Sequence, residues 1–166
     1  MKYPVAVTVN GRSHRKEVEA RTLLVDFLRD ALELTGTHVA CETSQCGACL
    51  VVFNGRTLKA CTCLAVQADG GHVTTIEGAC ADGALHPAQE ALLKGCALHC
   101  GFCAAGIVLA AREILSSSPV ANEEEVRGEL EGILCRCTGY QRVVDSILSA
   151  SDVAVREALD GGARDL

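Results

Sequence analysis

Four cysteines in the first half of the chain have a spacing typical of iron–sulfur ligands. Four residues separate Cys41 from Cys46, two separate Cys46 from Cys49, and eleven separate Cys49 from Cys61. The spacing C-x4-C-x2-C followed by a distant cysteine arranges thiolates around a 2Fe–2S cluster. The loop from Cys41 to Cys49 must bend sharply to bring three thiolates together, and Gly47 gives it that freedom. We therefore expect these four cysteines to bind one 2Fe–2S cluster.

Four further cysteines follow with a different spacing. Two residues separate Cys100 from Cys103, and one separates Cys135 from Cys137. This second set predicts a second cluster in a second domain. A 2Fe–2S centre changes by one electron and performs no bond chemistry, so two of them in a small chain indicate a conductor of single electrons. We expect the substrate to be handled by another protein.

The other candidate ligands have simpler interpretations. Cys63, Cys80 and Cys96 fit neither ligand set, and free cysteine often behaves as a small buried hydrophobic residue. Four of the five histidines show no paired ligand spacing and are interpreted as surface or packing residues: His14, His38, His72 and His86.

Composition limits the class of protein. The chain has 166 residues, of which 49% are hydrophobic but only 3% aromatic, enough for two compact domains. The eleven cysteines are an odd number and no apolar signal segment opens the sequence, which indicates the reducing cytoplasm rather than secretion. The apolar run 104–111 is far shorter than the roughly 20 residues of a membrane span. A net charge of −6 without a basic tract argues against nucleic acid as a partner.

The N-terminal elements needed to position the first ligand set form an α+β domain. Alternating residues from Val5 to Val9, the turn Asn10-Gly11 and a return to about Glu19 predict a hairpin. Apolar residues at helical spacing predict a helix capped by Thr22 and ended by Gly36. Strands are expected at 50–53, 57–61 and 73–76, with a second tight turn at 54–55. We place this domain at residues 1–77 and expect a β-grasp fold.

Helical patterns dominate after a linker at 78–85. We expect helices at 86–96, 104–117, 123–132 and 140–150, and a polar tail from Ser151 that frays. Asn122 and Glu125 are spaced as a capping box for the third helix. The second ligand set would then lie at the N-termini of the second and fourth helices, where amides and helix dipoles favour thiolates. The predicted second domain is a four-helix bundle over residues 86–160.

The combined motifs resemble one known family. The strings CETSQCGAC at 41–49, CGFC at 100–103 and CRCTGY at 135–140, with Cys61 between them, are similar to the small iron–sulfur subunit of the molybdenum hydroxylases, also called the xanthine oxidase family. The segments 21–24, 34–38 and 65–68 most resemble carbon monoxide dehydrogenase-type small subunits. The similarity covers about residues 3–150, with a plant-type ferredoxin loop in the first half.

The resemblance implies a route for electrons. One cluster would be held by Cys41, Cys46, Cys49 and Cys61, and the other by Cys100, Cys103, Cys135 and Cys137. The second would lie beside a molybdopterin cofactor on a large subunit, with Cys137 closest to the pterin. Electrons would then pass through the ferredoxin-like cluster to FAD on a medium subunit, in a complex that forms a dimer of heterotrimers.

One position departs from the family pattern. His99 stands before CGFC where the family commonly has glutamine. His99 is therefore a candidate pterin neighbour through a ring hydrogen bond, and equally a histidine that fills an interdomain surface.

Two other classes of function are weighed against the electron-transfer subunit. A stand-alone ferredoxin-like carrier would need only the first ligand set. Structural zinc sites also use cysteine pairs, although the plant-type spacing argues against them. The substrate of a complex stays open among carbon monoxide, an aldehyde, a purine, another N-heteroaromatic compound and an aromatic acyl-CoA, because no residue of this chain would touch it.

Overall fold

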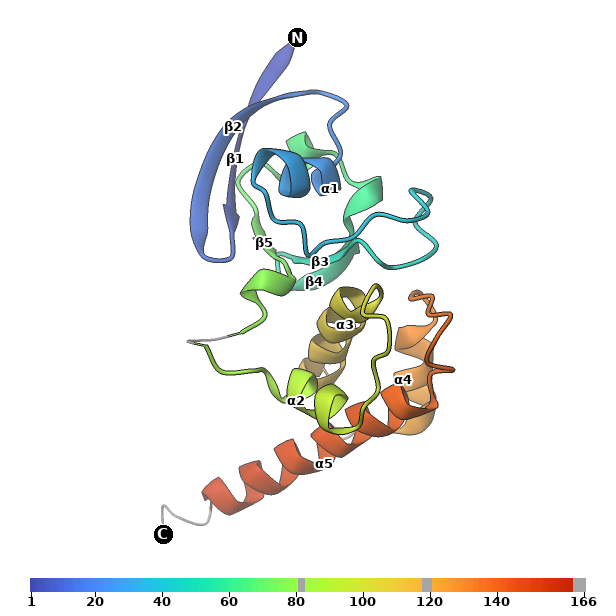
Figure 1. The fold of residues 1–166 in the computed structure, drawn as a ribbon. Coiled ribbons are helices and arrows are strands. Elements are labelled where there is room, and N and C mark those ends of the chain that lie inside the picture. Colours follow the sequence, from blue (N-terminus) through green and yellow to red (C-terminus); the bar gives the residue numbers. More distant parts are fainter. Residues whose placement is uncertain (81–82, 118–120, 163–166) are drawn as a thin grey trace.

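The structure is a computed structural model that describes residues 1–80, 83–117 and 121–162. A part that contains the sheet and the N-terminus is stacked on a helical part that contains the C-terminal helix (Figure 1). Within the described residues, no helix has the length and apolar character to cross a membrane.

The first part is built on a mixed five-stranded sheet. Its strands are β1 (Lys2–Val9), β2 (Arg12–Glu19), β3 (Leu50–Phe53), β4 (Arg56–Lys59) and β5 (His72–Thr74), in the order β2-β1-β5-β3-β4. β1 runs antiparallel to β2 and parallel to β5. Asn10 and Asn54 both have positive φ and are each followed by a glycine with positive φ, as tight hairpin turns require. Both predicted hairpins and the α+β class are therefore confirmed.

Several local predictions in this part are wrong. Helix α1 (Leu24–Asp26), which continues as the π-helical segment η1 (Phe27–Ala31), has Leu23 rather than Thr22 at its N-cap. The segment ends with Leu32 as its C-cap rather than at Gly36. Leu23 forms an isolated bridge with Leu64, and this extended pairing draws Thr22 away from the helix. The strand expected to reach Cys61 ends at Lys59 and gives way to the 3₁₀ turn η2 (Ala60–Thr62).

Two further 3₁₀ turns flank β5. These are η3 (Ala65–Ala68) and η4 (Ile76–Gly78). Ile76, expected at the end of a strand, therefore lies in a turn that leads toward the helical part.

Four helices form the second part: α2 (Pro87–Lys94), α3 (Ala104–Ser117), α4 (Glu123–Leu130) and α5 (Gln141–Gly162). The Asn122 side chain accepts from the Glu125 N–H at 2.9 Å, so the predicted capping box is confirmed. The last helix was expected to end at residue 150, whereas α5 continues to Gly162 and extends beyond the other helices (Figure 1). Ser151 is buried and its hydroxyl accepts from the Ala121 N–H.

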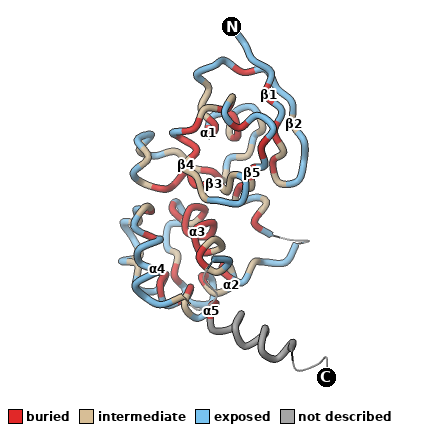
Figure 2. The backbone as a smooth tube through the Cα atoms, turned by 180° about the vertical axis from the view of Figure 1, so that it is seen from behind, coloured by how far each residue is buried: buried red, intermediate tan, exposed pale blue. Residues whose placement is uncertain are grey.

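The hydrophobic core consists of two clusters that meet beside α3. Val5, Val7 and Phe27 belong to the cluster under the sheet, and Ile107 and Leu109 of α3 belong to the helical cluster. The helical cluster also contains Leu50, which comes from β3. Figure 2 shows α3 as a largely buried element next to the sheet. The start of α3, where two predicted ligands stand, is therefore held against the first part.

Candidate iron–sulfur sites

The first ligand loop folds back on itself between η1 and β3. Glu42, Ser44 and Gly47 have φ values of 54°, 63° and 70°, and these left-handed turns bring its cysteines together. The Lys59 ammonium donates to the Ser44 carbonyl at 2.7 Å and fixes the loop to β4. A Cβ at Gly47 would lie only 2.5 Å from the Gly132 carbonyl oxygen, so this position requires glycine for space as well as for backbone conformation.

The environments of the thiols differ across this first site. A hydrogen bond from the Thr43 hydroxyl, together with the N–H groups of Thr43 and Cys46 at 3.4 and 3.3 Å from Cys41 Sγ, lowers the pKa of Cys41 to about 6. Burial raises the pKa of Cys49 to about 11. The loop therefore stabilises the thiolate of Cys41, whereas the buried thiolate of Cys49 needs the positive charge of bound metal.

The second ligand set lies at the starts of α3 and α5, as predicted. Cys100 and Cys137 are exposed, and their Sγ atoms are 3.8 Å apart. Cys103 is buried, and this burial raises the pKa of its thiol to about 12. Burial also disfavours the Cys135 thiolate, but hydrogen bonds from Thr138 and Cys103 outweigh it and lower the pKa of Cys135.

The eight thiols are arranged in four pairs. Cys100 lies against Cys137, and side-chain contacts also join Cys103 to Cys135, Cys41 to Cys46, and Cys49 to Cys61. Two thiolates on one tetrahedral metal with bonds of about 2.3 Å lie roughly 3.8 Å apart. Two thiol pairs per set fit a cluster of two irons, because each iron of a 2Fe–2S cluster takes two protein thiolates.

Tyr140 organises the turn that carries the last two cysteines. Its hydroxyl accepts from the Cys135 N–H at 2.6 Å and donates to the Ile133 carbonyl at 2.9 Å. Tyr140 itself has a φ of 65°, which turns the chain into α5. The phenol thus satisfies backbone groups that the irregular turn leaves without secondary-structure partners.

The two ligand loops touch each other. The Leu134 N–H donates to the Cys46 carbonyl at 2.9 Å, so a residue next to Cys135 is bonded directly to a residue of the first ligand set. A Cβ at Gly106 would lie 2.4 Å from the Gly47 carbonyl oxygen. Two glycines therefore allow α3 and the first loop to pack backbone against backbone.

The remaining candidates have mixed outcomes. His99 is exposed beside Cys100. Cys63 is buried as expected, but Cys80 and Cys96 are exposed, so the prediction that they fill apolar space is wrong. His38, interpreted from the sequence only as a surface or packing residue, contacts Phe102 in the second ligand set. The one indication of such a role in the sequence is that His38 stands three residues before Cys41.

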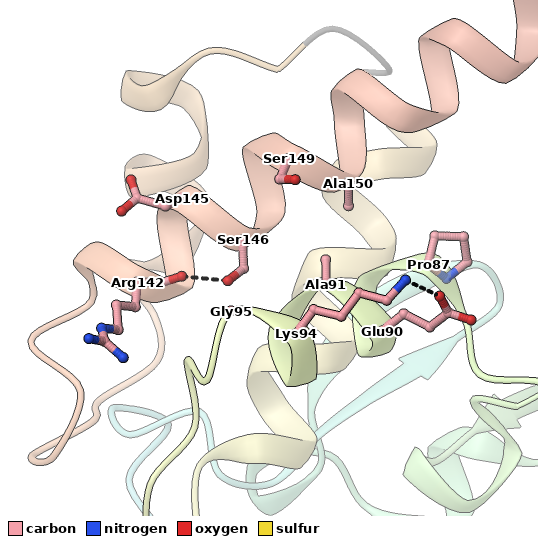
Figure 3. A pocket seen from close by; sticks show the side chains of 10 residues that line it. All are labelled: Pro87, Glu90, Ala91, Lys94, Gly95, Arg142, Asp145, Ser146, Ser149 and Ala150. Carbon is pink, nitrogen blue, oxygen red and sulfur yellow. Dashed lines mark hydrogen bonds and ion pairs between the residues drawn. The ribbon is translucent and has the colours of Figure 1, made fainter.

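One groove, of about 570 Å³, runs between α2 and α5 and is lined by residues that include Lys94, Arg142 and Ser146 (Figure 3). No cysteine lines it. The Lys94 ammonium is paired with Glu90 at 2.9 Å. The chemistry of the described chain is therefore concentrated at the cysteine pairs rather than in this groove.

The fold and the paired thiols define a two-domain iron–sulfur protein, and comparison with known proteins agrees. A family described as "2Fe-2S iron-sulfur cluster binding domain" matches residues 7–81. A second family, described as "2Fe-2S binding domain", matches residues 75–148.

Proteins similar over almost the whole chain are named as subunits of hydroxylases and dehydrogenases. The nicotine 6-hydroxylase small subunit of Paenarthrobacter nicotinovorans is 45% identical over 88% of each chain. The caffeine dehydrogenase subunit gamma of Pseudomonas sp. (strain CBB1) is 43% identical over 89% of this chain and 90% of the relative. The quinoline 2-oxidoreductase structure from Pseudomonas putida 86 superposes with a TM-score of 0.88 at 38% identity, over 93% of this chain and 97% of the matched chain.

The chain therefore belongs to the small iron–sulfur subunits of the molybdenum hydroxylases. It is a non-catalytic electron-transfer subunit of an oxidoreductase complex, with two 2Fe–2S-binding domains. The stand-alone carrier is disfavoured, because the similarity extends through the second domain.

Proposed function

We propose that the eight paired cysteines hold the two clusters of this subunit. Cys41, Cys46, Cys49 and Cys61 would ligate one, and Cys100, Cys103, Cys135 and Cys137 the other. The four side-chain pairs support this assignment, because each iron of a 2Fe–2S cluster takes two protein thiolates. The corresponding division is a β-grasp domain at 1–77, a linker at 78–85 and a four-helix-bundle domain at 86–160.

The contact between the ligand loops is the observation that carries the electron-relay function. When bound, the two clusters accept and release single electrons. The hydrogen bond from Leu134 to Cys46 and the close packing of Gly47 against Gly106 hold the loops of the two ligand sets in direct backbone contact. This chain's own contribution is thus to fix the separation of the two centres and the access to each.

The exposed end of the second site is the proposed contact with a large molybdopterin subunit. Cys100 and Cys137 are exposed there, and two apolar side chains beside them, Phe102 and Leu134, are 47% and 59% exposed. Exposed apolar groups at a redox site suit burial against another protein. His99 lies at the same edge and is proposed, with Cys137, as a neighbour of the pterin.

The assembly would be completed by a medium FAD subunit at the ferredoxin-like end. We further propose that two such heterotrimers form a dimer. We place the complex in the reducing cytoplasm, because none of the eleven cysteines, all within the described residues, forms a disulfide. The relatives named for nicotine, caffeine and quinoline support an N-heteroaromatic substrate for the complex.

Spin-counted EPR on the dithionite-reduced complex tests the ligand assignment. Two distinct signals near one spin each per small subunit, with about four irons, are expected. A single signal would restrict the assignment to one domain, and bound zinc without any signal would contradict it. Activity of the same preparation on N-heteroaromatic compounds compared with aldehydes and carbon monoxide tests the substrate class.

A further inference from the structure

One side chain connects the two ligand loops beyond the backbone contact already described. The His38 ring stacks on the Phe102 ring, with centroids 4.7 Å apart and planes inclined by 18°. Its Nδ1 lies 2.8 Å from the Phe102 carbonyl oxygen. Because a carbonyl only accepts, Nδ1 must carry the hydrogen of this bond. A single histidine thus contacts both the ring and the backbone of the residue that precedes Cys103.

His38 is held on the side of the first ligand set. Its backbone N–H donates to the Ala48 carbonyl at 3.2 Å, and Ala48 precedes Cys49. The Arg29 guanidinium donates to the carbonyls of Thr35 and Thr37, both at 2.7 Å, and ties the segment before His38 to η1. The imidazole therefore extends from a fixed backbone.

The segment is also restrained from the linker side. The Gly36 N–H donates to the Glu77 carboxylate at 2.8 Å, and the same carboxylate accepts from the Thr75 hydroxyl. A Cβ at Gly36 would lie 2.4 Å from Ile76 Cγ2, so the loop and η4 are in close contact. Because its backbone is restrained in this way, His38 can hold the residues that it contacts in a fixed position relative to the first domain.

The contact made by His38 falls on the turn that places two ligands of the second set. Phe102 stands between Cys100 and Cys103, in a turn where Gly101 has a φ of 86°. The Phe102 side chain is 47% exposed, so packing within this chain restrains it only partly. A stacked ring pair at this centroid distance and a hydrogen bond each stabilise one orientation of such a turn.

We infer that His38 is a positioning residue for transfer between the two clusters: through its stack and hydrogen bond to Phe102 it fixes the Cys100–Cys103 turn relative to the first ligand loop. The inference rests on the proposed ligand assignment. His38 is not one of the assigned ligands, and it acts by setting the separation and mutual orientation of the two centres.

The test compares variants of the assembled complex by EPR of the fully reduced protein and by amide hydrogen exchange at Phe102 and Cys103. The magnetic interaction between two reduced clusters splits their signals and depends on their separation and orientation. His38→Ala is expected to retain both signals near one spin each, to lose at least half of this splitting, and to accelerate exchange in the turn by about tenfold, the effect of removing one hydrogen bond and one ring stack. His72→Ala, at an exposed position on β5, is the matched control and should reproduce the wild type.

Two results would overturn the inference. The first is wild-type splitting and exchange in His38→Ala that carries both clusters. If His38→Ala fails to load the second cluster, His38→Leu decides, because it retains side-chain volume but has neither a donor nor an aromatic ring. The second overturning result is wild-type splitting in that loaded variant. Absence of two signals in the wild-type complex would instead contradict the ligand assignment, so the two failures are distinguishable.

Discussion

The Tyr140 hydroxyl joins two backbone groups five and seven residues before it, in the turn that carries Cys135. Tyr140→Phe removes both hydrogen bonds and leaves the Cys135 N–H and the Ile133 carbonyl without this partner. We expect the free energy of unfolding to fall by about 1–3 kcal/mol, as measured by urea denaturation of the cluster-loaded protein. Tyr3→Phe, at a position on β1 that is 42% exposed, should change it far less. Equal effects of the two substitutions would contradict the role given to Tyr140.

The assignment of ligands predicts a sharp division among the cysteines. Cys103→Ala is expected to lower the iron content by about half and to remove one of the two EPR signals, because the cluster loses one of its four thiolates. Cys80→Ala and Cys96→Ala replace exposed cysteines outside both ligand sets and should retain full iron. Loss of iron in either control would contradict the assignment of the eight cysteine ligands.

At the scale of residues, the structure confirms a prediction whose information is local in sequence. The need for Gly47 followed from the bend of the loop that carries Cys41, Cys46 and Cys49, and Gly47 has a φ of 70°. The His38–Phe102 contact spans 64 positions and depends on how two domains pack, so no local pattern contains it. The pairing of Cys100 with Cys137 has the same origin, because it is created by the approach of α3 and α5.

Among the elements, α3 packs closely against the first ligand loop at Gly106. Gly106→Ala would place a methyl group against the Gly47 carbonyl, and overpacking of this kind costs about 1–3 kcal/mol. Gly128→Ala in α4 meets nothing within 4 Å and should stabilise the protein by up to about 1 kcal/mol through helix propensity. Chemical denaturation of both variants checks the opposite signs, and stabilisation by both would show that the domain contact tolerates a methyl group.

The N-terminus of α2 links stability to pH. His86 is its N-cap and accepts from the Ala88 N–H through Nδ1, which requires the neutral ring. Burial, and secondarily the Arg112 charge, lower the pKa of His86 in the folded protein. A lowered folded-state pKa means that this stabilisation is complete above the unfolded value of about 6.5 and is lost as the pH falls through the folded value.

Substitution of His86 isolates this contribution from other titrating groups. His86→Asn supplies a capping oxygen that does not titrate in this range. Between pH 7.5 and 5.5 the free energy of unfolding of His86→Asn should decline less than that of the wild type, whereas His72→Asn should follow the wild type. A parallel decline in all three proteins would remove His86 as a cause.

The elements that were predicted best are those set by adjacent residues. Both Asn-Gly turns and the Asn122 cap are local chemistry, and they lie where the sequence places them. Thr22 failed as a cap because a bridge between Leu23 and Leu64, 41 positions apart in sequence, determines where α1 begins. The end of β4 was misplaced for a related reason, since the chain turns at Ala60 to deliver Cys61 to the first ligand loop.

For the whole molecule, the two ligand sets lie in contact and each has an exposed edge. Cys100 and Cys137 are exposed at the second set, Glu42 and Gln45 are exposed in the first loop, and the bond from Leu134 to Cys46 joins the two loops. Such an arrangement suits a subunit that receives electrons from one partner and passes them to another. Loss of the second cluster should therefore block electron flow to the flavin without affecting substrate binding or reduction of the molybdenum centre.

Cys137→Ala tests this consequence in the assembled complex. The variant removes the thiol at the exposed end of the second site, so substrate should still bind and reduce the molybdenum centre while the flavin stays oxidised longer. We expect stopped-flow flavin reduction by substrate to slow by at least about tenfold, while the substrate Kd changes by less than about twofold, because a step after binding is affected. Cys96→Ala should match the wild type in both quantities. Flavin reduction at the wild-type rate in a Cys137→Ala complex that has lost the second cluster would mean that electrons reach the flavin by a path that bypasses this domain.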